Sequence, residues 1–330
     1  MRILIASTAK IPVSSYGGTE RVIWYLGKEL FKLGHQIVYL VSEGSKCDFA
    51  PVIYIDSSKK ISEQIPQDID IVHFHFPPDD IDEVQTPYIV TIHGNVDFPF
   101  KFPINTVFVS RNHANRYSSD SFVYNGLDWQ DYSNPLAASH RDYFHFLGNA
   151  AWRVKNVKGA IGIIKGTRSE KINIIGGTRL NFKMGFRFTL TPRAIFSGMV
   201  GGEEKNLLLR KSKGLIFPIK WHEPFGLCII ESLYFGCPVF ATPYGSLKEL
   251  VIGDVGFLSN KKSELIEAVE NTGRYSKKVC HEYALENFNS KKMALTYLER
   301  YTRVLDNEPL NKQHPFSDNT PKPKFLDWHE

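Results

Sequence analysis

Short apolar segments that alternate with helical stretches are the feature that most restricts the fold of this 330-residue chain. In the first half the apolar segments are rich in β-branched residues, and the stretch 19–33 repeats apolar residues at spacings of three and four. Such alternation is typical of βαβ units and predicts a largely parallel sheet. The expected strands cover residues 3–7, 37–41, 69–75, 88–93, 106–109 and 122–124.

A polar loop at residues 125–141 interrupts this pattern, and a second α/β series follows it. Its expected strands cover residues 143–147, 172–175, 194–197, 214–218, 238–241 and 255–258, and helices are expected at about 263–271, 276–287 and 290–305. A chain of this length comfortably holds two cores. We therefore expect an α/β protein with domains at residues 1–135 and 136–305, followed by a tail at 306–330.

Composition narrows the class of protein. No apolar run is long enough for a membrane helix, and the amino terminus lacks a signal-peptide layout, so we expect a cytoplasmic protein. The four cysteines lack C-x-x-C spacing, which favours reduced thiols over disulfides or zinc. The formal charge of +5 suits anionic partners, such as nucleotide phosphates or an anionic membrane surface. Because basic residues are interleaved with acids, a nucleic-acid partner is not expected.

Two loops precede helices in a way that suits an anion. Gly17 and Gly18 lie just before the first expected helix, where small residues let a phosphate approach free backbone N–H groups. The alternative is a simple turn in which Thr19 caps the helix. These glycines do not form a dinucleotide fingerprint, because the G-x-G-x-x-G spacing is missing.

The second loop follows the apolar strand that ends at Phe217 and carries the strongest signal in the sequence. We expect a helix to begin near Pro224, so that the amides of Phe225, Gly226 and Leu227 point out of the carboxyl edge of the sheet, where open α/β sheets bind ligands. On such a helix Glu231 is rotated by only about 80° from Glu223, so both carboxylates face one cleft. The alternative is that each carboxylate only complements a helix dipole.

This segment, Glu223-Pro224-Phe225-Gly226-Leu227 followed by Glu231, resembles glycosyltransferase family four, whose signature places a second Glu seven residues beyond the first. Further resemblances lie in the motifs 17–20, 91–94, 125–128, 236–239 and 245–250, and together they cover the chain to about residue 305. The resemblance implies the GT-B fold, with two facing Rossmann-like domains and a cleft between them, and a last helix from about Ser290 that crosses back to the first domain. The tail at 306–330 is then expected to pack on that domain as well.

The resemblance also implies a mechanism and site residues. A nucleotide-diphosphate sugar would bind the second domain, a saccharide, lipid-linked or other acceptor the first, and the sugar would be transferred with retention. Glu223 is then expected to orient the donor sugar, Glu231 the donor ribose, and His93 the acceptor side of the reacting sugar. The family's diphosphate-binding Arg has no counterpart, because Asn149 follows Gly148 here, so Lys155, Lys158 and Arg153 are the candidate cations, with Lys155 first.

No metal is expected at the site. Asp68 and Asp70 have D-x-D spacing, but they stand at the entrance to a strand, and His73 and His75 lack a third ligand with suitable spacing. Two alternatives to a glycosyltransferase stay open, namely a sugar-nucleotide epimerase or phosphorylase of the same fold and a non-catalytic sugar-nucleotide-binding module. An NAD-dependent oxidoreductase is disfavoured by the missing fingerprint.

Overall fold

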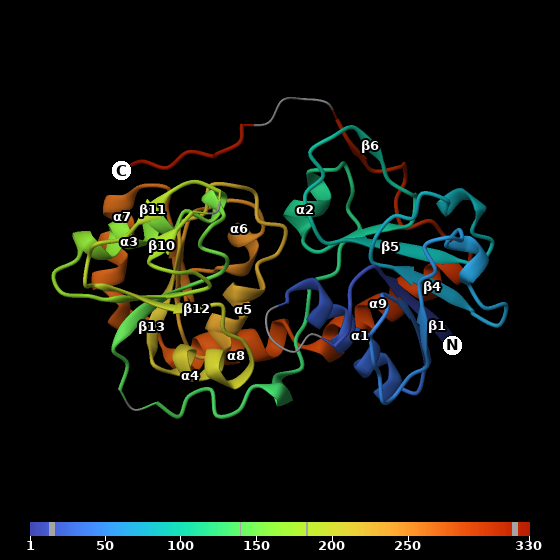
Figure 1. Ribbon diagram of the computed structural model, residues 1–330, viewed down its shortest axis with the longest axis horizontal. Helices are drawn as coiled ribbons and strands as arrows, with labels where there is room; N and C mark the ends of the chain where they lie inside the picture. The colour runs from blue at the N-terminus through green and yellow to red at the C-terminus, as the bar shows by residue number, and fades with distance from the viewer. Residues whose placement is uncertain (13–16, 139, 183, 319–322) are drawn as a thin grey trace. The chain divides into compact units, whose positions relative to one another are not determined.

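The computed structural model describes residues 1–12, 17–138, 140–182, 184–318 and 323–330, and they divide into two compact units. Over these residues, unit 1 comprises 1–12, 17–128 and 288–318, and unit 2 comprises 129–287 and 323–330. Each unit is an open parallel sheet with helices packed against it (Figure 1).

Unit 1 is built on a six-stranded parallel sheet in the order β3-β2-β1-β4-β5-β7. Its strands are β1 (Arg2–Ser7), β2 (Gln36–Val41), β3 (Val52–Tyr54), β4 (Ile71–Phe74), β5 (Tyr88–Ile92) and β7 (Thr106–Phe108). Its helices are α1 (Thr19–Lys32), α2 (Arg111–Asn115) and α9 (Ser290–Leu305). The strand expected at 122–124 is wrong, because only an isolated bridge joins Phe122 to Phe108 there.

Helix α1 follows from its sequence pattern. Val22, Leu26 and Leu30 are completely or almost completely buried, which accounts for the periodic spacing of apolar residues. Gly34 ends the helical stretch with a φ of +88°, a conformation that glycine adopts without steric cost. Helix α9 packs against α1 and β5 and buries Tyr297 and Tyr301 in the core of unit 1.

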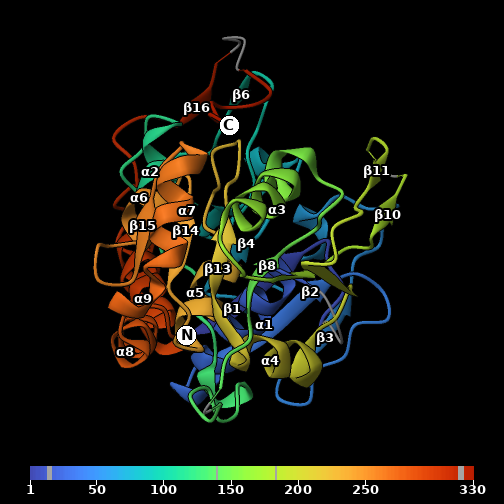
Figure 2. The same ribbon diagram turned by 90° about the vertical axis from the view of Figure 1, so that its left-hand side faces the viewer.

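Unit 2 has a second six-stranded parallel sheet in the order β12-β9-β8-β13-β14-β15. These strands are β8 (Tyr143–Leu147), β9 (Ile172–Ile175), β12 (Ala194–Gly198), β13 (Ser212–Phe217), β14 (Val239–Ala241) and β15 (Gly256–Leu258). Its helices are α3 (Val157–Gly166), α4 (Gly202–Arg210), α5 (Leu227–Tyr234), α6 (Leu247–Leu250), α7 (Lys262–Glu270) and α8 (Lys277–Asn287). Figure 2 shows α3 and α7 side by side, and α5 and α8 also pack together.

Smaller elements complete the two units. A hairpin of β10 (Leu180–Asn181) and β11 (Arg187–Phe188) belongs to unit 2, and β6 (Phe100–Lys101) pairs with β16 (Phe316–Ser317) in unit 1. Short 3-10 helices cover Ser62–Gln64, Ile81–Glu83, Trp129–Asp131, Arg153–Lys155 and Thr272–Arg274. No helix among the residues described is both long and apolar enough to cross a membrane.

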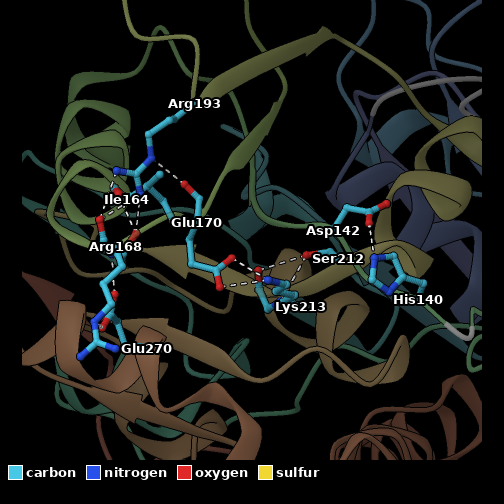
Figure 3. A network of polar contacts seen from close by, with 11 residues as sticks. His140, Asp142, Ile164, Arg168, Glu170, Arg193, Ser212, Lys213 and Glu270 are labelled. Carbon is cyan, nitrogen blue, oxygen red and sulfur yellow. Dashed lines mark hydrogen bonds and ion pairs between the residues drawn. The ribbon is translucent and has the colours of Figure 1, made fainter.

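The amino ends of the strands in unit 2 are held by polar contacts. Glu170, just before β9, accepts hydrogen bonds from Lys213 Nζ at the start of β13, and its carbonyl accepts one of 2.8 Å from Arg193 Nε, just before β12 (Figure 3). Arg193 also donates to the carbonyl of Thr167 over 3.1 Å. These contacts tie three strands together at this edge and leave the opposite, carboxyl edge as the place for a ligand.

The chain crosses between the units at residues 128–129 and 287–288. Near the second crossing, a Cβ on Gly126 would lie 2.2 Å from the carbonyl oxygen of Asn289, so only glycine fits. The expected bounds 1–135 and 136–305 therefore need correction, because residues 129–135 belong to unit 2 and α9 belongs to unit 1. The crossover expected at about Ser290 corresponds to α9.

The tail is divided between the units, which differs from the expectation that it packs on the first domain alone. Asn311 donates to the carbonyls of Ile104 and Thr106 in unit 1, and β16 pairs there as well. Beyond that point the backbone N–H of Leu326 donates to the carbonyl of Lys220 over 2.8 Å, within unit 2. The expected arrangement therefore describes only the first part of the tail.

Candidate functional site

The strand order of unit 2 reverses between β8 and β13, two strands that pair in parallel at the centre of the sheet. The connections that follow them, residues 148–156 and 218–226, leave the same edge of the sheet and run to α3 and α5. In open α/β sheets such a switch point, at the carboxyl ends of the strands, is where ligands bind. All the expected donor-side residues except Gly17, Gly18 and Glu231 lie in these two loops or at the first turn of the helix that follows.

Glu223 lies in the loop after β13 and not in a helix. Helix α5 begins at Leu227, three residues later than the expected start near Pro224, because Gly226 has a φ of +89° and interrupts the helical geometry. The expected 80° relation between Glu223 and Glu231 is therefore wrong. The loop instead places the two carboxylates independently, Glu223 before the helix and Glu231 within it.

The loop that follows β14 fixes Glu223 in place. A Cβ on Gly245, whose φ is +65°, would lie 2.3 Å from both the backbone N and the backbone O of Glu223. The N–H of Ser246 donates to the carbonyl of Glu223 over 3.0 Å, and its hydroxyl donates to the carbonyl of Phe225 over 2.6 Å. Glycine at 245 thus allows a close backbone contact that holds the loop carrying Glu223.

Glu223 forms a buried ion pair with Lys155, the expected first cation. Lys155 Nζ lies 2.5 Å from Glu223 Oε2, and Trp221 Nε1 donates to the same oxygen over 2.8 Å. The ammonium also lies 4.8 Å from the centre of the Trp221 ring and 5.1 Å from that of Phe217. The carboxylate is therefore held in one orientation by a cation and an indole that contact the same oxygen. Its other oxygen, Oε1, has no hydrogen-bond partner among the described residues.

Glu231 also has a buried lysine partner, and the sequence did not reveal it. Lys205 of α4 forms an ion pair with Glu231 Oε1, and the hydroxyl of Tyr132 donates to the same oxygen over 2.9 Å. Both charged residues are almost completely buried. Lys205 follows two glutamates on a polar helix, a pattern that ordinarily marks a solvated side chain, so the sequence carried no signal for it.

The carboxylates of Glu223 and Glu231 both affect the pKa of one neighbour, Cys228. Burial raises the pKa of the Cys228 thiol, the Glu223 and Glu231 carboxylates raise it further, and the Lys155 ammonium opposes them. Cys228 is therefore kept as a neutral thiol.

The first turn of α5 offers hydrogen-bond donors. Within the described part of the chain, the backbone N–H groups of Gly226 and Leu227 have no acceptor. The carbonyl of Phe225, the third residue expected here, is held by Ser246. Free amides at the start of a helix favour an anion through their dipoles and their direction.

The other two candidate cations line a cavity of about 430 Å³ beside this loop. Arg153 and Lys158 both contribute to its wall, whereas Lys155 and Glu223 do not. Phe325 of the tail also lines it, and its ring lies 5.2 Å from the Arg153 guanidinium carbon and 5.0 Å from Lys220 Nζ. Asn156 caps α3 at the cavity wall, accepting from the N–H of Gly159 and donating to the carbonyl of Pro218.

Unit 1 holds the expected acceptor-side histidine in a separate cavity of about 340 Å³. His93 Nε2 lies 2.8 Å from His75 Nδ1, and burial lowers the pKa of His93 to about 4, so the ring is neutral at neutral pH. His75 is nine-tenths buried, and its Nε2 has no hydrogen-bond partner among the described residues. The cavity is otherwise mainly aromatic and apolar, with Phe76, Phe98, Phe100 and Phe102 in its wall.

The glycine loop of unit 1 reaches α1 without special backbone geometry. Gly18 is the residue before the helix, with a φ of −101°, and Thr19 is the first helical residue rather than the cap. Arg21 Nε donates to the carbonyl of Gly17 over 2.6 Å. Tyr16, which precedes these glycines, lies outside the described residues.

The D-x-D pair lies away from the carboxyl edge of its sheet. Asp68 forms an ion pair with Arg2, and Asp70 accepts from the N–H of Arg2 over 2.7 Å, both at the amino end of β4. His73 is buried between Tyr301 and Thr91, each 2.8 Å from one of its ring nitrogens. Over the described ranges, no group of three or more His, Cys, Asp or Glu side chains is placed to hold a metal ion.

Comparison with known proteins assigns this arrangement to a known class. Residues 141–272, which contain the switch point and both glutamates, match the family model described as glycosyl transferases group 1. The O-antigen chain mannosyltransferase C of Escherichia coli is 22% identical, and the match covers 93% of this chain and 100% of that protein.

Solved structures with the same fold support the assignment. AviGT4, a glycosyltransferase involved in avilamycin A biosynthesis, superimposes with a TM-score of 0.72 at 18% identity and covers 92% of this chain and 98% of its own. Anabaena HepE, crystallised with UDP and glucose, gives a TM-score of 0.63 at 12% identity over 92% of this chain and 99% of its own. The matches to the family model and to the mannosyltransferase show that the chain is a glycosyltransferase similar to family four, and the solved structures show that its two parallel-sheet units have the GT-B fold.

Proposed function

We propose that this glycosyltransferase takes its sugar from a nucleotide-diphosphate donor bound on unit 2 and transfers it, with retention, to a saccharide or lipid-linked acceptor bound on unit 1. The observation that supports the donor assignment best is the pair of buried glutamate–lysine contacts around the first turn of α5, next to free amides at Gly226 and Leu227. Departure of a nucleoside diphosphate builds negative charge, and preorganised N–H groups and cations lower the free energy of that step.

Each residue then has a distinct role. Glu223 positions the donor sugar through its carboxylate, which Lys155 and Trp221 hold in place. Glu231 binds the donor ribose from within α5, and Arg153 and Lys158 neutralise the diphosphate from the cavity wall. His93 faces the acceptor as a neutral ring that can both donate and accept a hydrogen bond.

The relatives support a role in building cell-surface glycans or glycolipids, because one of them is a mannosyltransferase of O-antigen synthesis. Such acceptors are often carried on membrane lipids, and we propose that this protein works in the cytoplasm at a membrane surface. The proposed transfer uses no metal ion.

A donor screen tests the proposed function directly. Nucleotide sugars that differ in base and sugar should be compared by the shift in melting temperature that each produces, because a bound ligand stabilises the fold by mass action. The best donor should then release nucleoside diphosphate faster when saccharide acceptors are added, and NMR of the product should show the anomeric configuration of the donor. Isomerisation of the donor without transfer would favour an epimerase, and binding without turnover a non-catalytic module.

A further inference from the structure

The hairpin β10–β11 of unit 2 presents an unusual face to solvent. Its even-numbered residues from 180 to 190 are all apolar, and strand alternation puts alternate residues on one side. They are Leu180, Phe182, Met184, Phe186, Phe188 and Leu190, with exposed fractions of 44%, 73%, 61%, 66%, 52% and 80%. We call these six residues the apolar face of the hairpin.

Contacts on the opposite side hold this orientation. Arg187 is almost completely buried, donates to the carbonyl of Thr178 over 3.0 Å and lies 5.3 Å from the centre of the Phe196 ring. Arg179 lies 5.5 Å from the same ring and donates to the carbonyls of Thr189 and Ala194. The hairpin therefore turns its arginines toward the body of unit 2 and its aromatic residues outward.

The exposed side chains form a continuous surface rather than scattered residues. Leu180 pairs with Phe188 across the two strands, and the rings of Phe182 and Phe186 lie 5.7 Å apart. A contiguous apolar patch of this kind on a folded protein marks a surface that another molecule or a membrane covers. Met184 and Phe186 reach the wall of the 430 Å³ cavity, which also carries the exposed cations Arg153 and Lys158.

Charge around the hairpin indicates what covers it. Residues 171–202 contain five Lys or Arg residues and no Asp or Glu, while the whole chain has 40 Lys or Arg and 35 Asp or Glu. The net charge of this segment is therefore +5, which equals the net charge of the whole protein, and the rest of the chain carries equal numbers of basic and acidic residues. Because Arg179 and Arg187 of this segment turn toward the body of unit 2, the cations that flank the apolar face are the exposed Arg153 and Lys158 on the cavity wall. An apolar face flanked by exposed cations complements a bilayer with anionic headgroups.

We propose that the apolar face of the hairpin docks unit 2 on an anionic lipid bilayer, with the aromatic side chains at the boundary between headgroups and acyl chains. This inference takes up the membrane contact proposed above and names the surface that makes it, but it does not depend on sugar transfer. A second copy of the chain fits less well, because an isologous contact would bring the same cationic segments together.

Vesicle flotation with the full-length protein tests the proposal. Wild-type protein should bind vesicles of phosphatidylglycerol mixed with phosphatidylcholine, bind pure phosphatidylcholine more weakly, and be released by high salt. The variant carrying Phe182→Ser, Phe188→Ser and Leu190→Ser changes three exposed residues that do not line the cavity. It should bind the anionic vesicles at least about tenfold more weakly, given the apolar area that it removes.

A matched variant controls for the loss of apolar surface in general. Ile252→Ser, Val279→Ser and Leu285→Ser change three exposed residues of unit 2 outside the hairpin, and this variant should bind vesicles as the wild type does. Donor-induced thermal shifts should be the same in all three proteins, which shows that they are folded and separates this test from that of the proposed function. Equal vesicle binding by the hairpin variant overturns the proposal. The proposal is also overturned if the wild type does not bind vesicles but forms a concentration-dependent dimer that the hairpin substitutions abolish.

Discussion

Glu223 and Glu231 each form an ion pair with a buried lysine, and this determines what their substitution measures. Glu223→Gln should lower kcat by roughly 10- to 100-fold, because the contact that orients the reacting sugar tightens as positive charge develops on it. Glu231→Gln should mainly raise KM by a similar factor, because a contact to the ribose is equal in the ground and transition states. Steady-state kinetics on both variants distinguishes the two roles.

Melting temperatures must accompany these kinetics. Removing one charge of a buried pair leaves Lys155 or Lys205 without its counter-ion, so both variants should also lose stability. If the glutamates only complemented a helix end, each substitution would cost about 0.3–1 kcal/mol and leave the kinetics unchanged. Unchanged kcat for Glu223→Gln in a folded protein would remove this residue from the proposed mechanism.

The buried histidines of unit 1 predict how stability depends on pH. Burial lowers the pKa of His93 to about 4 and that of His113 to about 3, both below the ordinary histidine pKa of 6.5. Above pH 6.5 these rings are neutral in the folded and unfolded states alike, so the stability is fully present there. As the pH falls from 6.5 toward 4, the unfolded chain takes up protons that the folded chain does not, and stability is lost.

The melting temperature should therefore be nearly constant above pH 7 and should fall steadily between about pH 6.5 and 4. In His113→Asn this fall should be shallower, whatever the variant's stability at neutral pH, because one of the buried rings no longer titrates. A wild-type melting temperature that stays level down to pH 4 would contradict the burial of these rings as the cause.

At the scale of elements, the turn at Gly245 controls the loop that carries Glu223. Gly245→Ala should destabilise unit 2 by about 1–3 kcal/mol and lower kcat, because the new methyl group collides with the backbone of Glu223 and the residue must keep a positive φ. Gly253→Ala is the matched control, since nothing lies within 4 Å of its Cβ position. Thermal unfolding and kinetics of the two variants check this, and equal behaviour would show that the loop adapts.

Elements with a clear apolar period were predictable from the sequence, and those set by tertiary contacts were not. Helix α1 follows from Val22, Leu26 and Leu30, which form its buried face. The start of α5 was misplaced because Pro224 suits a first helical turn, whereas the positive φ of Gly226 delays the helix to Leu227. The hairpin β10–β11 was missed because its apolar residues face solvent, the reverse of the usual pattern.

The site residues also divide into those that a sequence motif indicates and those that only tertiary contacts define. Glu223 was identified from a family motif, whereas its ion pair with Lys155 was not predicted, because no sequence pattern indicated that these two side chains meet. Lys205 was not identified, because its burial depends on Glu231 and Tyr132, which are distant in sequence. A partner that is supplied by another element leaves no local pattern from which to infer it.

At the scale of the whole molecule, the described residues enter unit 2 at 128–129 and leave it at 287–288 before the tail returns. The first crossing lies near a visible break in the sequence pattern at residues 125–141. The second, between α8 and α9, lies in the short stretch 288–289 with no loop-like composition, and only the family resemblance pointed to it. The return of the tail to unit 2 at 323–330 rests on backbone hydrogen bonds and on side-chain contacts such as the ion pair of Glu330 with Lys262, whose partners are distant in sequence.

The distribution of charge over unit 2 leads to the last prediction, that transfer needs no divalent cation. Lys155 and Lys205 are each paired with a glutamate, so the cations left for a diphosphate are Arg153, Lys158 and Lys220 on the cavity wall, together with the amides of α5. These are enough to oppose two phosphate charges. EDTA should therefore leave kcat and KM nearly unchanged. The double variant Arg153→Ala, Lys158→Ala should instead raise the donor KM by about tenfold or more, because hydrogen bonds to charged groups contribute about 1.5–3 kcal/mol each. Activity that is lost in EDTA and restored by Mn²⁺ or Mg²⁺ would show instead that the diphosphate reaches the site with a metal ion.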